Sequence, residues 1–343
     1  MSIEERLFYN GKKVIRPFSI TAGVKCRDYS LPLQRRIVDF GSDVSFERVV
    51  RKMYEHYGVI VPASSVRAIV EGHARMMRQG ENLQRNIQQD GAELIVSQID
   101  GTMVPIVQTD TIGNEKQTLD KRKNRAVFWK EARLSLARDS TSVTPVFGAV
   151  IGTPEQAGDH LLDCALQVGF GEKSHVHGVG DGALWIADQM ERVFGSRASY
   201  LIDFYHLCEY LAKAANGCSS APKVWLEEQK KLLKENDVSL VLDNMRPYLE
   251  APSISKENAP VRNCFNYISN RLRQFDYKDA LEKKLPIGSG EIESAHRYVI
   301  QQRLKIPGAW WKEENANNML ALRTVRANED WEDYWKKYTK KAA

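Results

Sequence analysis

Cysteine is scarce in this chain, and the few cysteines that occur are widely spaced. Five are spread over 343 residues, and no two of them form a Cys-x-x-Cys pair: Cys26, Cys164, Cys208, Cys218 and Cys264. This spacing argues against a disulfide framework and against a cysteine zinc site. It fits a protein that works in a reducing cytoplasm.

Long apolar runs are also missing. No segment approaches the roughly 20 apolar residues that a membrane-spanning helix needs. The start of the chain, Met1 to Arg6, is charged, and no apolar run follows it, so we expect no signal peptide. These absences favour a cytoplasmic protein over a secreted or membrane-spanning one.

Neither sign of charge dominates. The chain has 49 basic and 44 acidic residues, which gives a formal net charge of +5 and a pI near 8.8. This balance permits a nucleic-acid partner without requiring one. The hydrophobic content of 43% is that of a globular protein, and the length allows two or three domains.

The N-terminal part is basic and then helical. Residues 45–57 place apolar side chains on one helical face, and Gly58 should end that helix. Ser64 could cap a second helix. The pair is either a helix-turn-helix or a plain helical hairpin. We therefore expect residues 1–92 to form a basic, helical DNA-binding region.

From residue 93 the pattern changes to strands with helical crossovers. We expect the order three strands, helix, strand, helix, strand and helix. The material for the first three strands is 94–100, then 103–108 and 127–137 around a polar loop (113–125), and 145–151. The later elements are helix 154–168, strand 174–180, helix 184–194, strand 199–203 and a helix from about 206. This α/β order resembles the mixed sheet of the ribonuclease H-like fold. In that fold the first and fourth strands are parallel neighbours.

Two aspartates follow the first and fourth of these strands. Asp100 ends an apolar run, and Asp181 follows another. Ligands of open α/β sheets bind where parallel strands end, so the two carboxylates should meet there. Each has an alternative interpretation. Asp100 precedes a glycine and could belong to a turn. Asp181 lies in Gly-x-Gly-x-x-Ala, which resembles a dinucleotide-binding turn, although its carboxylate would repel a pyrophosphate.

Further polar residues lie around these strand ends. Asp203 and His206 form Asp-x-x-His after the last strand, where Asp203 could cap a helix or steady the site. His175 and His177 alternate on one strand and are more typical of packed or hydrogen-bonded residues than of metal ligands.

The C-terminal segment supplies one more acidic position and a set of basic ones. Glu291 and Glu293 follow Pro286-Ile-Gly-Ser-Gly290 at the start of a helix, and periodicity does not choose between them. Residues from about 206 to 284 look entirely helical. Downstream basic residues could contact phosphates or form a solvated face: Arg297, Arg303, Lys305, Arg323 and Arg326.

Taken as an ordered set, these stretches resemble insertion-sequence transposases of the Asp-Asp-Glu class, of the Kra type, and the wider group with Mutator-like and hAT enzymes. The matching stretches span residues 99 to 323: Ile99–Pro105, Trp129–Glu131, Gly180–Ile186, Asp203–His206, Leu285–Ser294, Arg303–Lys305, Gly308, Trp311 and Leu320–Arg323. The sequence departs from relatives that carry paired N-terminal cysteines for zinc, because only Cys26 is present there.

The resemblance implies a function and assigns roles. It selects Glu293, within Ile-Glu-Ser, as the third carboxylate beside Asp100 and Asp181, and two Mg²⁺ or Mn²⁺ ions as cofactors. It implies that Asp203 and His206 support these residues. DNA contacts are expected from Arg297, Arg303, Lys305 and Arg323. The implied domains are 1–92 for DNA binding, 93–205 and 285–343 for the catalytic core, and 206–284 for an all-α insertion.

The implied reaction is cleavage of element ends, followed by attack of the freed 3′-OH on target DNA. The partners are double-stranded DNA and further copies of the chain, since two ends must be paired. Two alternatives stay open: a catalytically silent DNA-binding relative, and a structure-selective nuclease on the same fold.

Overall fold

The computed structural model describes residues 5–11, 14–21, 29–80, 87, 89–109 and 125–342. The loop expected at 113–125 therefore lies almost wholly outside the described residues, as do Cys26 and several N-terminal basic residues. In the part that is described, no helix is long and apolar enough to cross a membrane.

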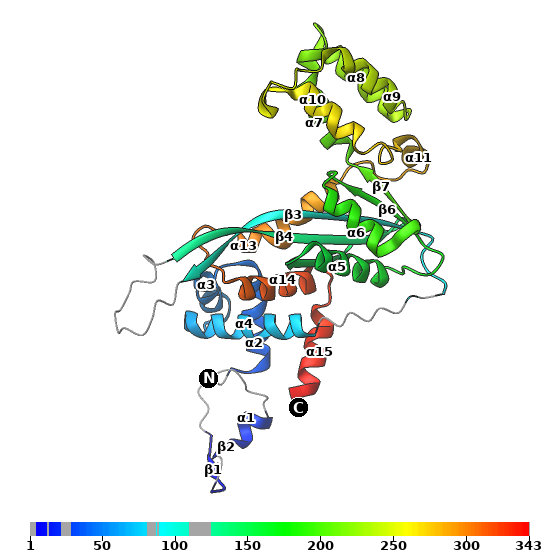
Figure 1. The fold of residues 1–343 in the computed structure, drawn as a ribbon. Helices are drawn as coiled ribbons and strands as arrows, with labels where there is room; N and C mark the ends of the chain where they lie inside the picture. The colour runs from blue at the N-terminus through cyan, green and yellow to red at the C-terminus, as the bar shows by residue number, and fades with distance from the viewer. Residues whose placement is uncertain are drawn as a thin grey trace.

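A five-stranded mixed sheet forms the centre of the protein (Figure 1). Its order is β5-β4-β3-β6-β7. The strands are β3 (Leu94–Thr109), β4 (Arg125–Asp139), β5 (Val146–Ile151), β6 (His175–Gly180) and β7 (Ala198–Ile202). The first three are antiparallel, whereas β6 runs parallel to both β3 and β7. The α/β class, the element order and the parallel first and fourth strands are as predicted.

One prediction for the sheet was wrong in detail. Segments 94–100 and 103–108 are a single strand, because β3 continues through Asp100 and Gly101 and pairs with β4 along its whole length. Asp100 is therefore not part of a turn. Pro105, which lacks an N–H, is tolerated because, among the described residues, no strand pairs with the far half of β3 on its other side.

Helices cover both faces of the sheet, because side chains alternate along each strand. Ile95 and Ile99 pack with α5 (Pro154–Gln167) and α6 (Leu184–Phe194). Val104 and Ile106 point to the other face and pack with α14 (Glu313–Ala327).

Helix α5 begins where the sequence indicates, since Thr153 and Gln156 form a capping box before Pro154. The short 3-10 helices are η1 (Gly195–Arg197), η2 (Arg246–Tyr248) and η3 (Lys256–Asn258).

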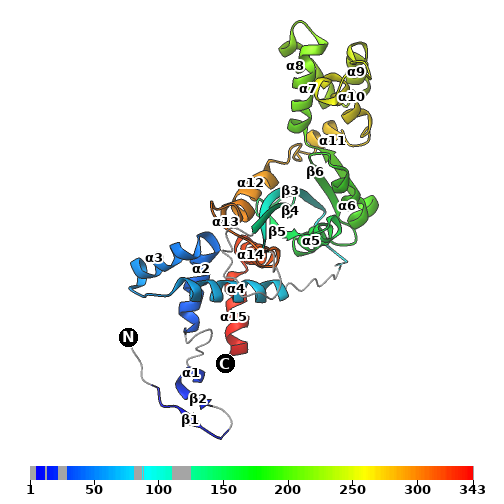
Figure 2. The same cartoon turned by 60° about the vertical axis from the view of Figure 1, so that its left-hand side comes forward.

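A helical unit stands on the β7 side of the sheet (Figures 1 and 2). It has its own core and contains α7 (Phe204–Cys218), α8 (Pro222–Lys234), α9 (Val238–Met245), α10 (Pro260–Ser269) and α11 (Tyr277–Glu282). The prediction that residues 206–284 are helical is confirmed.

The chain then returns to the sheet. It forms α12 (Gly290–Ala295), the π-helical turn η4 (His296–Gln301) and α13 (Gln302–Leu304) as one continuous helix, as expected from the sequence. Helix α14 is followed by α15 (Trp331–Ala342), which was not predicted from the sequence.

The N-terminal helices lie below the sheet, with α4 beside α14 in both views (Figures 1 and 2). The described elements are β1 (Phe8–Tyr9), β2 (Val14–Ile15), α1 (Pro17–Thr21), α2 (Leu31–Asp43), α3 (Phe46–Tyr57) and α4 (Ala63–Gln79). Gly58 ends α3 with a positive φ of 64°, as its position indicated. Whether α3 and α4 act as a helix-turn-helix stays a prediction.

Helix α15 is held by a buried histidine. His73 on α4 contacts the Tyr334 hydroxyl through Nδ1 at 2.7 Å and Gln34 Oε1 through Nε2 at 3.0 Å. Because Gln34 Oε1 can only accept, Nε2 carries the proton and Nδ1 accepts from Tyr334. Burial lowers the His73 pKa from 6.5 to about 4, so the folded protein keeps the ring neutral.

Stability should therefore fall with acid. A lowered histidine pKa contributes stability that is complete above the unfolded pKa of 6.5 and is lost as the pH falls toward 4. Between pH 7.5 and pH 5.0 we expect a loss of about 2 kcal/mol from His73. Urea unfolding of wild type and His73→Gln at both pH values checks this. Equal pH dependence of the two proteins would contradict it.

Candidate active site

The expectation that Asp100 ends a strand was wrong, because β3 continues past it; Asp100 and Asp181 instead lie side by side where the parallel pairing between β3 and β6 ends. The last register pair between β3 and β6 is Gln98 with Val179, and each aspartate lies two residues further along its own strand direction. Neighbouring strands are about 4.8 Å apart. The Asp100 side chain is partly exposed, at 29%. Two carboxylates separated by 81 sequence positions therefore reach the same edge of the sheet.

The loop that carries Asp181 is fixed by the sheet and by the helical unit. The Asp181 carboxylate accepts from the Ala183 N–H at 2.8 Å, and its carbonyl accepts from the Tyr267 hydroxyl at 2.6 Å. Arg271 Nε donates to the Gly182 carbonyl at 2.9 Å. Tyr267 on α10 and Arg271, just after that helix, thus hold the Asp181 loop in place.

Gly182 is required in this loop. Its φ is +82°, and a Cβ there would collide with the Tyr267 hydroxyl. Its N–H donates to the Tyr200 hydroxyl at 3.2 Å, and the next N–H, of Ala183, binds Asp181. These N–H groups are already bound, which argues against a dinucleotide-binding turn.

Asp203 joins two separate segments at the end of β7. One carboxylate oxygen caps α7 by accepting from the N–H groups of Tyr205 and His206, at 2.6 and 2.9 Å. The other accepts from the N–H and hydroxyl of Ser289. Asp203 is only 3% exposed. It therefore performs the capping role and also anchors the loop that leads to Glu293.

Three further hydrogen bonds seat this loop, residues 286–290, and the helix after it. His177 lies 2.8 Å from the Pro286 carbonyl through Nε2, and the Phe204 N–H donates to the Ile287 carbonyl at 2.8 Å. Burial lowers the His177 pKa, so the ring is neutral and donates. Gln98 accepts from the Ile292 N–H at 2.9 Å. The hydrogen-bonded role expected for His177 is confirmed.

Loss of the Asp203 contacts should be costly. Asp203→Ala removes a helix cap and leaves buried Ser289 donors without their acceptor, so we expect about 3 kcal/mol less stability. The matched control is Asp237→Ala, since Asp237 also precedes a helix but its side chain makes no capping hydrogen bond. Urea unfolding measures both. A loss for Asp203→Ala no larger than for Asp237→Ala would contradict the anchoring role.

The structure separates the two glutamates that periodicity left open. The Glu291 carboxylate binds Arg138 Nε of β4, at 3.0 and 3.1 Å. Glu293 has an exposed side chain on another face of α12. Residues three apart on a helix are neighbours, so Glu293 lies beside His296.

His296 in turn reaches the first aspartate. Its Nε2 lies 3.2 Å from the outer oxygen (Oδ2) of Asp100, and its side chain is almost completely buried. The helix that carries Glu293 is thereby placed against the first half of β3, since Gln98 binds its first turn and His296 contacts Asp100 one turn later.

The donor chemistry of these three carboxylates fits a hard divalent cation such as Mg²⁺ or Mn²⁺. Among the residues that the structure describes, however, no group of three His, Cys, Asp or Glu side chains is arranged to hold an ion. The structure therefore places Asp100 beside Asp181 and brings the helix of Glu293 to Asp100 through His296, without grouping the three carboxylates around one point.

The predicted supporting histidine, His206, is linked to the site indirectly. Its ring packs against Tyr210 and Tyr267, with centroid distances of 5.5 and 6.3 Å. Tyr267 is the residue whose hydroxyl binds the Asp181 carbonyl. His206 thus supports the tyrosine that holds Asp181.

Two of the four basic residues expected to contact DNA are buried, and those assignments were wrong. Arg303 is 2% exposed, donates to the Gly41 carbonyl at 3.0 Å and lies between the rings of Phe46 and Trp311. Arg323 is 7% exposed. It binds backbone carbonyls of neighbouring helices and the Asp43 carboxylate. Both guanidinium groups therefore hold α2 to the C-terminal helices.

The other two basic residues stay accessible. Arg297 is exposed, one turn beyond Glu293. Lys305 is partly exposed, and its Nζ lies 3.0 Å from Thr102 Oγ1, two residues beyond Asp100 on β3. Arg297 therefore lies on the helix that carries Glu293, and Lys305, at the end of that helix, contacts the strand that carries Asp100.

Three residues of the site were not predicted from the sequence. His296 could have been found, because it lies one helical turn from Glu293 and imidazole is a common partner of a carboxylate. Tyr267 and Arg271 gave no local signal, since they lie 86 and 89 positions from the loop that they hold.

A comparison with known families relates about half of the chain to one of them. The model of an uncharacterised protein family (UPF0236) matches residues 170–337, which include Asp181, Asp203, His206 and Glu293. No match to a curated protein was found.

Proposed function

We propose that this chain is a DNA transposase with a ribonuclease H-like core, in which Asp100, Asp181 and Glu293 are the catalytic carboxylates. One observation carries the proposal. Two aspartates lie beside each other where the parallel pairing of β3 and β6 ends, and the helix bearing Glu293 is hydrogen-bonded to Gln98 and contacts Asp100 through His296.

The topology supports this proposal. The sheet begins with an antiparallel meander of three strands, and two parallel strands joined through helices follow. This order of elements resembles that of ribonuclease H-like enzymes. The helical unit between β7 and α12 corresponds to the all-α insertion that such transposases carry before their glutamate. The comparison rests on element order and strand direction.

The residues of the site have separable tasks in this proposal. Asp100, Asp181 and Glu293 would hold Mg²⁺ or Mn²⁺, which when bound polarises a phosphodiester and activates the attacking water or 3′-OH. Asp203 keeps the loop before Glu293 in position. Tyr267 and Arg271 keep Asp181 at the end of its strand.

Substrate and assembly follow from the reaction. The substrate would be double-stranded DNA, both the ends of the mobile element and the target. At least two copies of the chain are expected on DNA, because two ends must be cut and joined together. The proposed location is the cytoplasm.

The test is a cleavage and joining assay with labelled DNA from the sequences that flank the coding region. A transposase releases a 3′-OH in the presence of Mg²⁺ and then joins it to a second DNA. Cleavage without joining would replace the proposal with a nuclease on the same fold. DNA binding without either reaction would replace it with a catalytically silent relative.

Binding to DNA should depend on salt through Arg297 and Lys305. Each phosphate contact adds about 0.9 to the slope of log affinity against log salt. Alanine at either residue should therefore lower the slope by about that amount. Lys173→Ala is the matched control, since Lys173 is exposed at the opposite end of β6. Slopes measured by fluorescence anisotropy that are equal in all variants would contradict these contacts.

A further inference from the structure

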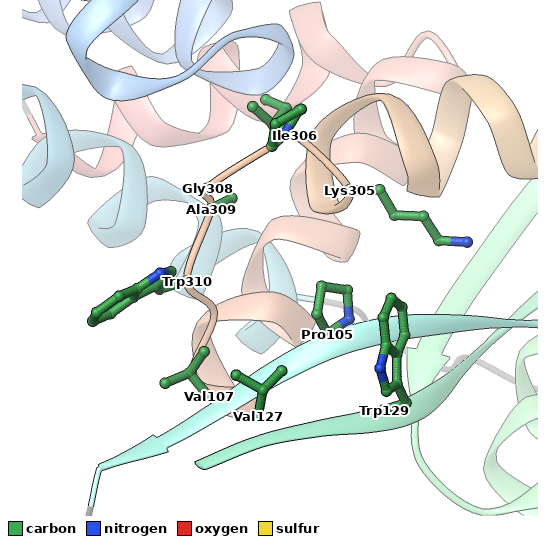
Figure 3. A pocket seen from close by; sticks show the side chains of 10 residues that line it. Pro105, Val107, Val127, Trp129, Lys305, Ile306, Gly308, Ala309 and Trp310 are labelled. Atoms are coloured by element: carbon green, nitrogen blue, oxygen red, sulfur yellow. The ribbon is translucent and has the colours of Figure 1, made fainter. Parts of the chain in front are cut away.

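A groove runs between the far half of the β3–β4 hairpin and the loop that follows α13 (Figure 3). Its cavity volume is about 290 Å³. The walls come from these residues: Pro105, Val107, Val127, Trp129 and Lys305 to Trp310. The loop is tied to the free edge of β3, because the Val107 N–H donates to the Trp311 carbonyl at 2.7 Å.

The groove has aromatic walls that solvent reaches. Trp129 is 61% exposed and Trp310 is 42% exposed. In Figure 3 the Trp129 ring stands upright beside Pro105, and Trp310 lies at the other end of the groove. Exposed tryptophans that flank an apolar hollow are typical of a binding surface and are uncommon on an inert one. Flat aromatic walls suit a flat ligand, which can stack on them.

Lys305 gives the groove a positive charge at the end nearer the carboxylates. Its side chain lines the groove, and its Nζ reaches Thr102 Oγ1 at the edge of β3. Thr102 is two residues from Asp100. Pro105 is five residues from Asp100, which is about 17 Å along a strand. A DNA strand whose phosphate lies at Asp100 therefore reaches the groove within a few nucleotides, around the edge of β3.

We propose that this groove binds one unpaired base of the DNA substrate, stacked on Trp129, with Lys305 against the adjoining phosphate. The proposal rests on the proposed function and adds a place for a base outside the duplex. Stacking on aromatic side chains combined with a neighbouring cation is how proteins hold unpaired nucleotides. The volume is at the lower end of the roughly 300–1,000 Å³ of small-ligand sites, which suits one base.

The test compares two DNA ligands of equal length, one fully duplex and one with a three-nucleotide unpaired tail. Both are labelled and bound without divalent cations, so that no cleavage occurs. Trp129→Ala should weaken binding of the tailed DNA about tenfold and leave duplex binding unchanged. Trp129→Phe keeps an aromatic face and should retain most of the affinity. Phe128→Ala is the matched control, since Phe128 is 48% exposed on the opposite face of the same strand.

The outcomes separate the two proposals. If wild type binds neither DNA at low salt, the proposed function itself fails. If wild type binds both DNA ligands while Trp129→Ala and Phe128→Ala have equal affinities for the tailed DNA, the proposal of a base-binding groove is wrong. An equal loss on duplex and tailed DNA would also overturn it. A change in the sedimentation of Trp129→Ala without a tenfold loss of its affinity for the tailed DNA would also overturn the proposal. That result would mean that a second copy of the chain covers the groove. Thermal melting shows that each variant is folded.

Discussion

Replacing Asp100 or Asp181 with alanine is expected to abolish DNA cleavage and to leave the fold intact. Both side chains are partly exposed, so their loss removes little buried surface. If they hold divalent cations, each contributes several kcal/mol to the stabilisation of the transition state. A loss of that size lowers the cleavage rate at least about a thousandfold.

The rate of strand cleavage in Mg²⁺ measures this effect. Asp188→Ala is the control, because Asp188 is an exposed carboxylate on α6 and its replacement leaves Asp100 and Asp181 unchanged. DNA affinity and the melting temperature should be close to wild type in all three variants. Cleavage by Asp100→Ala or Asp181→Ala at near wild-type rates would reject them as catalytic residues.

The second large effect distinguishes Glu293 from Glu291. Both carboxylates lie in the first turn of α12, where the helix dipole contributes roughly 0.3–1 kcal/mol to either one. Glu291→Gln weakens a partly exposed pair with Arg138, so we expect a small loss of stability and nearly full activity. Glu293→Gln keeps the shape of an exposed side chain and removes its charge. We expect cleavage to fall at least about a hundredfold in that variant.

Glu291→Gln and Glu293→Gln serve as controls for each other, since the two variants differ only in which carboxylate becomes an amide. Cleavage rates in Mg²⁺ and melting temperatures should be measured together. A slow Glu291→Gln variant beside a fast Glu293→Gln variant would reverse the assignment. Equal cleavage rates would remove both residues from the catalytic site.

Most elements of the sheet could be predicted from periodicity, because each strand is bounded by clear polar segments. The exception is β3, where Asp100-Gly101 and Pro105 both suggest an interruption. The strand continues because β4 pairs with it throughout and because Pro105 lies where no strand follows on the other side. Helix α15 was missed because its apolar face, which includes Trp331 and Trp335, is completed only by packing against α4.

The acidic positions could be found in the sequence, whereas their surroundings could not. Apolar runs that end in an acidic residue pointed to Asp100 and Asp181, although β3 continues past Asp100. The choice between Glu291 and Glu293 needed either the family resemblance or the contact with Arg138, which is 153 positions away. Arg303 was misassigned because a basic residue in a helix gives no sign of burial when its donors are satisfied by distant carbonyls such as that of Gly41.

Binding of Mn²⁺ to the purified protein, followed by electron paramagnetic resonance in the presence of DNA, tests the central claim most directly. Wild type and Glu291→Gln should bind the ion with similar affinity. Asp181→Ala and Glu293→Gln should each bind it at least about tenfold more weakly, because each loses one carboxylate ligand. Identical binding by all four proteins would contradict a divalent-cation site formed by Asp100, Asp181 and Glu293.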